Sequence, residues 1–172
     1  MSDRALLVLD ANVLIDYCAA DRDVLTLASR HVGQIHVPSV ILDEVDGLDE
    51  SECARLGLVV VEPDGALLIA AGRRRPGLSY YDHVCLLAAK AAGWTCVTND
   101  GRLRRECTAD KVPVLWGLEL MVPLVAERHL TASAATAVAG AIHTANPIYI
   151  TKDIVRRFEM RVARTKGPKP PR

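Results

Sequence analysis

Four carboxylates stand where the sequence predicts the ends of strands and the first turns of helices. Asp10 and Asp100 each come just after a short apolar run, whereas Glu44 and Asp82 lie in segments with helical periodicity. Carboxylates gathered without His or Cys suit a hard divalent cation, Mg²⁺ or Mn²⁺. One or two such ions can activate a water molecule and stabilise charge on a phosphoryl group. These residue types therefore favour phosphodiester hydrolysis, which needs no nucleophilic Ser, Cys or His.

Two of the acids are predicted to face inward. At 100° per residue, Glu44 falls in the middle of the apolar face of a helix predicted over 40–48, and Asp82 lies nearer the core face of a helix over 79–92. A charge in an apolar stripe is costly unless it is paired or bound to metal. Each acid alone also has a simpler interpretation: Asp10, Asp82 and Asp100 could cap helices, and Glu44 could pair with a surface Arg. Together, however, four neighbouring acids would repel one another without a cation.

The elements that must position these acids alternate between strand and helix. Strands are predicted over 5–9, 35–37, 58–61, 95–98 and 112–115. Helices are predicted over 12–31 (which could break near 20–23), 40–48, 66–72, 79–92, 101–107 and 117–127. The strands show no alternation of apolar and polar residues, so both of their faces should be buried. This pattern predicts a three-layer α/β/α sandwich around a central parallel sheet of about five strands, whose ligands would lie beyond the carboxyl ends of the strands.

Four short motifs, in this order and at these spacings, resemble those of the PIN-domain family. They are Asp10-Ala11-Asn12, Val40-Ile41-Leu42-Asp43-Glu44-Val45, Tyr81-Asp82-His83-Val84 and Val97-Thr98-Asn99-Asp100. The resemblance covers about residues 5–126. Members of that family resemble small α/β/α nucleases, and many are VapC-type toxins that cut RNA. The resemblance implies that Asp10, Glu44, Asp82 and Asp100 form an acidic quartet, with Asn12 and Thr98 as supporting polar residues near the metal.

The resulting hypothesis is a Mg²⁺- or Mn²⁺-dependent endoribonuclease, with Asp10 and Asp100 holding the principal ion. Family frequency adds a toxin role with a cognate antitoxin. The basic C-terminal helix could bind RNA, pack on the domain or pack on a second subunit in a homodimer. The main alternative is a non-catalytic PIN-like scaffold that binds RNA or protein. A haloacid-dehalogenase-type phosphatase also begins with an Asp after its first strand, but it needs a second Asp where this chain has Asn12. A receiver-type switch needs an acceptor Asp in mid-domain and a Lys after a late strand, and neither is evident.

Other polar residues receive less specific interpretations. Asp16 and the acids around 43–50 are expected on solvated faces, and His83 at the surface or behind the site. Two groups of arginines are candidates for gripping RNA phosphates. They are Arg73, Arg74 and Arg75 in a loop before the Asp82 helix, and Arg102, Arg104 and Arg105 just after Asp100.

The formal net charge of zero is a cancellation between regions. Residues 131–172 carry eight basic and two acidic side chains (+6), whereas residues 1–130 carry 13 basic and 19 acidic ones (−6). The change in character predicts a nuclease domain over 1–130, a basic helical extension over 131–165 and a disordered tail over 166–172. Neutrality therefore does not exclude a nucleic-acid partner. Aromatic residues make up only 4% of the chain, which is poor material for stacking many bases.

Five cysteines without Cys-x-x-Cys spacing predict buried thiols in a reducing compartment. The first apolar run is too short for a leader, and no run approaches the ~18 apolar residues of a membrane span. A cytoplasmic protein without a membrane segment is therefore expected.

Overall fold

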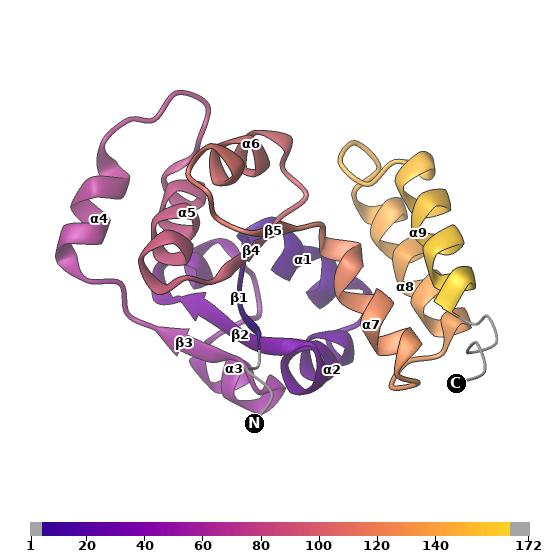
Figure 1. Ribbon diagram of the computed structural model, residues 1–172. Coiled ribbons are helices and arrows are strands. Elements are labelled where there is room, and N and C mark those ends of the chain that lie inside the picture. Colours follow the sequence, from indigo (N-terminus) through magenta and orange to yellow (C-terminus); the bar gives the residue numbers. More distant parts are fainter. Residues whose placement is uncertain (1–4, 166–172) are drawn as a thin grey trace, which may run out of the picture.

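A five-stranded parallel sheet forms the centre of the protein in this computed structural model, which describes residues 5–165 (Figure 1). The strands lie in the order β3-β2-β1-β4-β5, and every neighbouring pair is parallel. They are β1 (Ala5–Leu9), β2 (Gly33–Pro38), β3 (Val59–Val61), β4 (Thr95–Val97) and β5 (Val114–Leu115).

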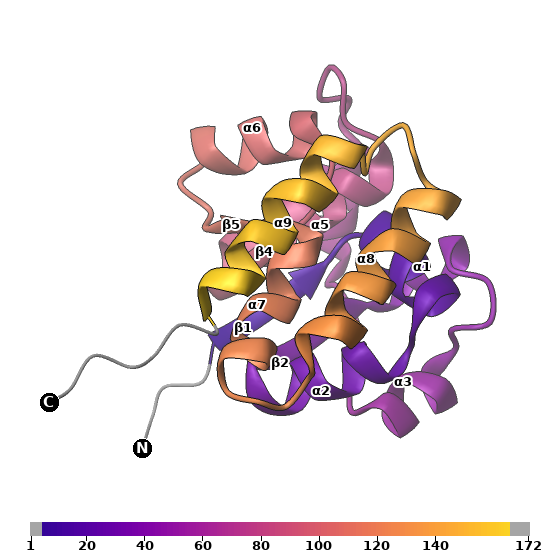
Figure 2. The same ribbon diagram turned by 90° about the vertical axis from the view of Figure 1, so that its right-hand side faces the viewer.

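Helices cover both faces of this sheet, with α5 and α6 on one side and α1, α2 and α7 on the other (Figures 1 and 2). The helices of the sandwich are α1 (Ala11–Ala20), α2 (Asp23–His31), α3 (Glu50–Leu56), α4 (Gly65–Gly72), α5 (Tyr80–Ala92), α6 (Gly101–Ala109) and α7 (Met121–Ala126). Two 3₁₀ segments, η1 (Ser39–Glu44) and η2 (Gly117–Leu120), complete it. The predicted three-layer α/β/α fold with a five-stranded parallel sheet is confirmed. Of the helices described between residues 5 and 165, none combines the length and apolar character that crossing a membrane requires.

The sheet changes direction between β1 and β4. From β1 the chain moves outward through β2 to β3, and it then crosses back to place β4 on the other side of β1. The register pairs Leu9 with Val97 across these two strands. The residues that follow, Asp10 and Thr98, therefore leave the sheet side by side at its carboxyl edge. In open parallel sheets this switch point is where ligands bind.

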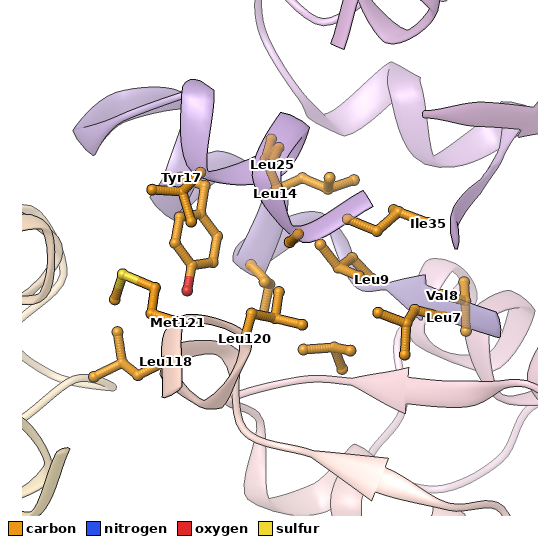
Figure 3. Packing of buried hydrophobic residues seen from close by; sticks show 14 of the residues in the cluster. Leu7, Val8, Leu9, Leu14, Tyr17, Leu25, Ile35, Leu118, Leu120 and Met121 are labelled. Carbon is orange, nitrogen blue, oxygen red and sulfur yellow. The ribbon is translucent and has the colours of Figure 1, made fainter. Parts of the chain in front are cut away.

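The core is built from aliphatic residues on β1 and the helices that pack against it. Leu7, Val8 and Leu9 are at most 1% exposed, so this part of β1 is buried on both faces as predicted, whereas Ala5 and Leu6 at its start are exposed. Figure 3 shows Tyr17 of α1 beside Met121 of α7 in the same cluster. Complete burial of such side chains contributes roughly 1.5–3 kcal/mol each. Four of the five cysteines are also buried as free thiols, as predicted, and Cys18 is half-buried.

Local signals explain where α5 begins and ends. The Ser79 side chain accepts a hydrogen bond from the backbone N–H of Asp82, and the Asp82 carboxylate accepts one from the backbone N–H of Ser79. This capping box fixes the first turn. Gly93 ends the helix with φ +69°, a left-handed conformation that glycine adopts without a Cβ clash. The predicted helix over 79–92 is therefore confirmed to within one residue.

The segment after β2 differs from its prediction. A helix was expected over 40–48, but the structure has η1 ending at Glu44, followed by a turn with Gly47 at φ +71°. Apolar residues at helical spacing also fit a short 3₁₀ segment and a turn, since both bury side chains every third or fourth position. The sequence interpretation also missed α3, which begins after Asp49, whose carboxylate accepts a hydrogen bond from the N–H of Glu52.

Two further helices extend the fold on the α1 and α7 side. They are α8 (Ala132–Ala145) and α9 (Lys152–Thr165). Figure 2 shows them antiparallel to one another, with α8 against α1 and α9 against α7. Phe158 and Val162 of α9, four residues apart on one face of the helix, are buried. The prediction for residues 166–172 lies outside the described part of the chain.

Candidate functional site

Asp10 is the most buried of the four candidate acids. It is the N-cap of α1, where its Oδ1 accepts a hydrogen bond from the backbone N–H of Val13 at 2.8 Å. Its Oδ2 accepts a hydrogen bond from the hydroxyl of Thr98. The residue is only 1% exposed. Burial raises the pKa of Asp10 to about 7; the two hydrogen bonds oppose this shift, and the nearby Asp82 and Asp100 charges add to it.

Thr98 connects Asp10 to Asp100. Its hydroxyl oxygen also accepts a hydrogen bond from the backbone N–H of Asp100 at 3.0 Å. Asp100 is in turn the N-cap of α6, and its Oδ1 accepts from the N–H groups of Arg102 and Leu103 at 2.7 and 2.8 Å. The first turns of α1 and α6 thus meet at one hydroxyl. The capping interpretations considered for Asp10 and Asp100 are correct, and capping leaves each carboxylate facing the sheet edge.

Asp82 lies in the first turn of α5, on the face of the sheet opposite α1. Its Oδ2 accepts hydrogen bonds from the backbone N–H and the hydroxyl of Ser79, at 3.1 and 2.8 Å. Its charge nevertheless acts on both Asp10 and Glu44, whose pKa values it raises. The next residue, His83, is turned away into the protein, where its Nδ1 lies 3.0 Å from the carbonyl oxygen of Ala71 in α4. His83 therefore joins two helices and lies buried rather than at the surface.

Glu44 is exposed, so the prediction that it faces inward was wrong. The prediction assumed a full α-helix, whereas Glu44 is the last residue of the 3₁₀ segment η1. The apolar face assumed over 40–48 is not formed, because the short helix ends at Glu44 and Val45 already has an extended backbone (φ −115°, ψ 96°), so Glu44 stands at a bend in the chain. Partial burial, and then the charge of Asp82, still raise the pKa of Glu44. It therefore lies at the open side of the same acidic group.

The structure thus brings Asp10, Asp82 and Asp100 into electrostatic contact, and it links Glu44 to them through Asp82. Thr98 lies among them and is fully buried. Asn12, the other supporting residue implied by the resemblance, is exposed on the first turn of α1.

The donor set suits a divalent cation in its chemistry, although its geometry is open. Within residues 5–165, no three His, Cys, Asp or Glu side chains stand close enough together to form a metal-binding group. Asp10, however, is a buried carboxylate with two carboxylates near it and no cationic partner among its interactions. A cation at the sheet edge would favour its ionised form. Carboxylate oxygens are also the ligands that Mg²⁺ and Mn²⁺ prefer.

Asp16 was expected on a solvated face, and that expectation was wrong. It is 5% exposed, and its two carboxylate oxygens accept hydrogen bonds from Asn99 at 3.4 Å and from Asn146 at 3.1 Å. Asn99 also accepts a hydrogen bond from the backbone N–H of Gly117. Burial raises the pKa of Asp16, and the two amide donors oppose this shift. Asp16 therefore ties α1 to the turn before Asp100 and to the end of α8.

Some of the candidate RNA-binding arginines already form contacts within the protein, and the others are exposed. Arg75 forms ion pairs with Glu106 at 2.5 Å and with Asp110 at 3.1 Å, which attach the 73–78 loop to α6. Arg104 donates a hydrogen bond to the carbonyl oxygen of Thr98 at 3.4 Å, and its guanidinium lies 3.6 Å above the ring of Trp116. These two are therefore committed to internal contacts. Their neighbours Arg73, Arg74, Arg102 and Arg105 are exposed.

Comparison with known proteins adds one structural likeness. No model of a known protein family matches the sequence, and no curated protein matches it. Among solved structures, the chain is similar to a PilT N-terminus domain protein from the hyperthermophilic archaeon Sulfolobus solfataricus. The likeness covers 69% of this chain and 92% of that one, at 13% sequence identity and a TM-score of 0.49. The functional argument therefore depends on this chain's own residues.

Proposed function

We propose that the protein is a metal-dependent endoribonuclease that hydrolyses RNA phosphodiester bonds at the acidic edge of its sheet. The observation that carries the proposal is the burial of Asp10 at the β1–β4 switch point: desolvation raises its pKa to about 7, and the charges of Asp82 and Asp100 add to the shift. Ionising a buried carboxylate beside two like charges costs free energy unless a cation is bound there. Such perturbed carboxylates are typical of sites that bind cations or transfer protons. Carboxylate oxygens as the donor atoms favour Mg²⁺ or Mn²⁺.

The roles follow from how each acid is held. Asp10 and Asp100, fixed as helix N-caps on adjacent strands, would hold the principal ion, and Asp82 and Glu44 would complete its surroundings or a second site. When bound, the ion would supply an activated water and stabilise charge on the phosphate. Thr98 holds the Asp10 carboxylate in place through its hydroxyl. Glu44 is the most exposed of the four acids, so a substrate could approach the site from the side on which Glu44 lies.

The family resemblance contributes a role as the toxin of a toxin–antitoxin pair, with a cognate antitoxin as protein partner. The proposed homodimer would use the basic C-terminal helix, and the cytoplasmic location is proposed from the free cysteines. The resemblance also contributes RNA as the substrate. Asn12, exposed beside Asp10, would support the metal site from its open side.

The direct test is cleavage of total RNA by the purified protein with Mg²⁺ or Mn²⁺, with an EDTA control. We expect metal-dependent cleavage that Asp82→Asn and Asp10→Asn each reduce at least ~10²-fold, because each removes a negative charge from the site. Asp43→Asn is the matched control, since Asp43 is an exposed acid next to Glu44. Unchanged metal-dependent cleavage by Asp82→Asn and Asp10→Asn would contradict the assignment of the site.

A second measurement separates the nuclease from the non-catalytic scaffold. Mg²⁺ or Mn²⁺ should raise the thermal unfolding midpoint of the wild-type protein, because a ligand that binds only the folded state stabilises it, by about 2.7 kcal/mol at 100 times its Kd. Asp10→Asn should abolish that shift. A metal-dependent shift without cleavage of any RNA would favour the scaffold.

A further inference from the structure

A groove runs between α9 and the segment that follows β5. It has a volume of about 340 Å³ and is lined by Trp116, Leu118, Glu119, Val122, Ile154, Arg157, Phe158 and Arg161. That volume lies at the lower end of the range of ligand clefts, about 300–1,000 Å³. Leu118 and Phe158 are buried in its floor, whereas Trp116 is 39% exposed at its side. The groove thus combines an apolar floor with an accessible aromatic ring and two arginines.

The groove is continuous with the acidic edge of the sheet. The backbone N–H of Thr98 donates to the carbonyl oxygen of Leu115, so Trp116 follows β5 at the same edge at which Asp100 follows β4. Arg104 spans the two places, since it donates to the carbonyl oxygen of Thr98 and stacks over the ring of Trp116. A chain lying in the groove would therefore lead directly to the carboxylates.

The charge of the groove favours an anionic occupant. Its one acid, Glu119, is already used, because it forms an ion pair with Arg161 and accepts a hydrogen bond from the backbone N–H of Trp116. Arg157 is exposed and forms no ion pair with the described residues. Arg104 lies over one face of the Trp116 ring, and Trp116 nevertheless remains 39% exposed beside the groove.

We propose that this groove binds single-stranded RNA, with one base stacked on Trp116 and a backbone phosphate beside Arg157. The inference rests on the proposed ribonuclease function, which it extends by naming the surface that holds the substrate. Aromatic platforms flanked by cations are how proteins bind single strands without reading their sequence. A base in a duplex is already stacked on its neighbours and cannot reach the ring, so the groove selects unpaired RNA. The basic α9 helix thereby gains a role beside the acidic site.

The test is the affinity for a short labelled oligouridylate, measured by fluorescence anisotropy with EDTA present so that no cleavage occurs. Trp116→Ala should weaken binding by roughly 5- to 100-fold, whereas Trp116→Phe should retain most of the affinity because it keeps an aromatic face. Arg157→Ala should weaken binding several-fold and reduce the slope of log K against log salt concentration by about 0.7. Arg156→Ala is the control, since Arg156 is also exposed on α9, where it pairs with Asp153 at 3.7 Å, but does not line the groove.

The proposal is supported if Trp116→Ala and Arg157→Ala lose affinity while Arg156→Ala does not, and if a duplex of the same length binds more weakly. It is overturned if Arg157→Ala and Arg156→Ala behave alike, or if Trp116→Phe and Trp116→Ala both bind as tightly as the wild type. Because binding is measured without metal, its result is independent of whether Asp10→Asn or Asp82→Asn abolishes cleavage, so the two proposals can fail separately.

Discussion

The hydroxyl of Thr98 donates a hydrogen bond to the carboxylate of Asp10, and this contact joins the carboxyl ends of the two strands at which the sheet changes direction. Thr98 is fully buried and Asp10 is 1% exposed, so water does not replace the bond. The same hydroxyl accepts from the backbone N–H of Asp100. One side chain therefore sets the relative position of two acids of the proposed site.

Replacing Thr98 with Val should test that role. Valine has the same shape but no hydroxyl, so it leaves the Asp10 carboxylate and the Asp100 N–H without their partner. We expect a loss of about 1–3 kcal/mol of unfolding free energy in urea. Thr98→Ser keeps the hydroxyl and should retain most of the stability. If Val and Ser variants were equally stable, the bond would not hold this edge.

The metal-free protein should lose stability as pH rises, and Asp10 should be one cause. The pKa of Asp10 in the fold, about 7, lies above its ordinary value of 3.8, so the folded protein binds this proton more tightly than the unfolded chain does. Its contribution to stability is complete below pH 3.8 and is lost as pH rises through about 7. Asp10→Asn removes the charge, so at about pH 8 with EDTA it should be more stable than the wild type by about 2–4 kcal/mol.

This difference should be measured by urea unfolding across the pH range, and it should vanish toward pH 4. Asp43→Asn is the control, because this exposed carboxylate has no comparable burial. An Asp10→Asn variant that is less stable than the wild type at high pH would show that the buried charge is compensated in another way.

The bond between Asn146 and Asp16 should stabilise the attachment of the C-terminal helices. Asn146→Ala leaves Oδ1 of a buried carboxylate without its donor, at an expected cost of about 1–3 kcal/mol. The Asn146 amide favours the ionised form of Asp16, whose pKa burial raises. The cost should therefore be larger at neutral pH than near pH 4. A double-mutant cycle with Asp16→Ala measures the coupling, and additive effects would disprove the contact.

Of the three consecutive arginines at 73–75, Arg75 should contribute to stability, whereas the exposed Arg74 should not. Arg75→Ala breaks the ion pairs with Glu106 and Asp110, and it should cost about 1 kcal/mol at neutral pH. Arg75 lowers the pKa of Asp110, so this stabilisation is present above pH 3.8 and is lost as pH falls below it. Arg74→Ala, at an exposed position, should leave thermal stability unchanged. Equal stability of the two variants at neutral pH would contradict the structural role of Arg75.

Much of the sheet edge could be predicted because its signals are local. An apolar run followed at once by Asp10 specifies a buried strand and a helix N-cap within a few residues, and Ser79 with Asp82 specifies a capping box in the same way. The alternation of strands and helices predicted a parallel sheet, but it did not predict the order of the strands in that sheet. The adjacency of β1 and β4, which places Asp10 beside Thr98, is a property of the assembled sheet.

The sequence could not predict the burial of residues whose partners are far away in the chain or whose segment takes a different type of helix. Helical periodicity placed Glu44 in the core, but the chain takes a 3₁₀ turn there and exposes it. Asp16 looked like a solvated residue because its partner Asn146 is 130 positions away. The sequence by itself thus determined which acids stand at element ends, since capping and strand burial act over a few residues. The fold decided which charges are buried or neutralised, because desolvation and pairing depend on what the complete chain brings alongside.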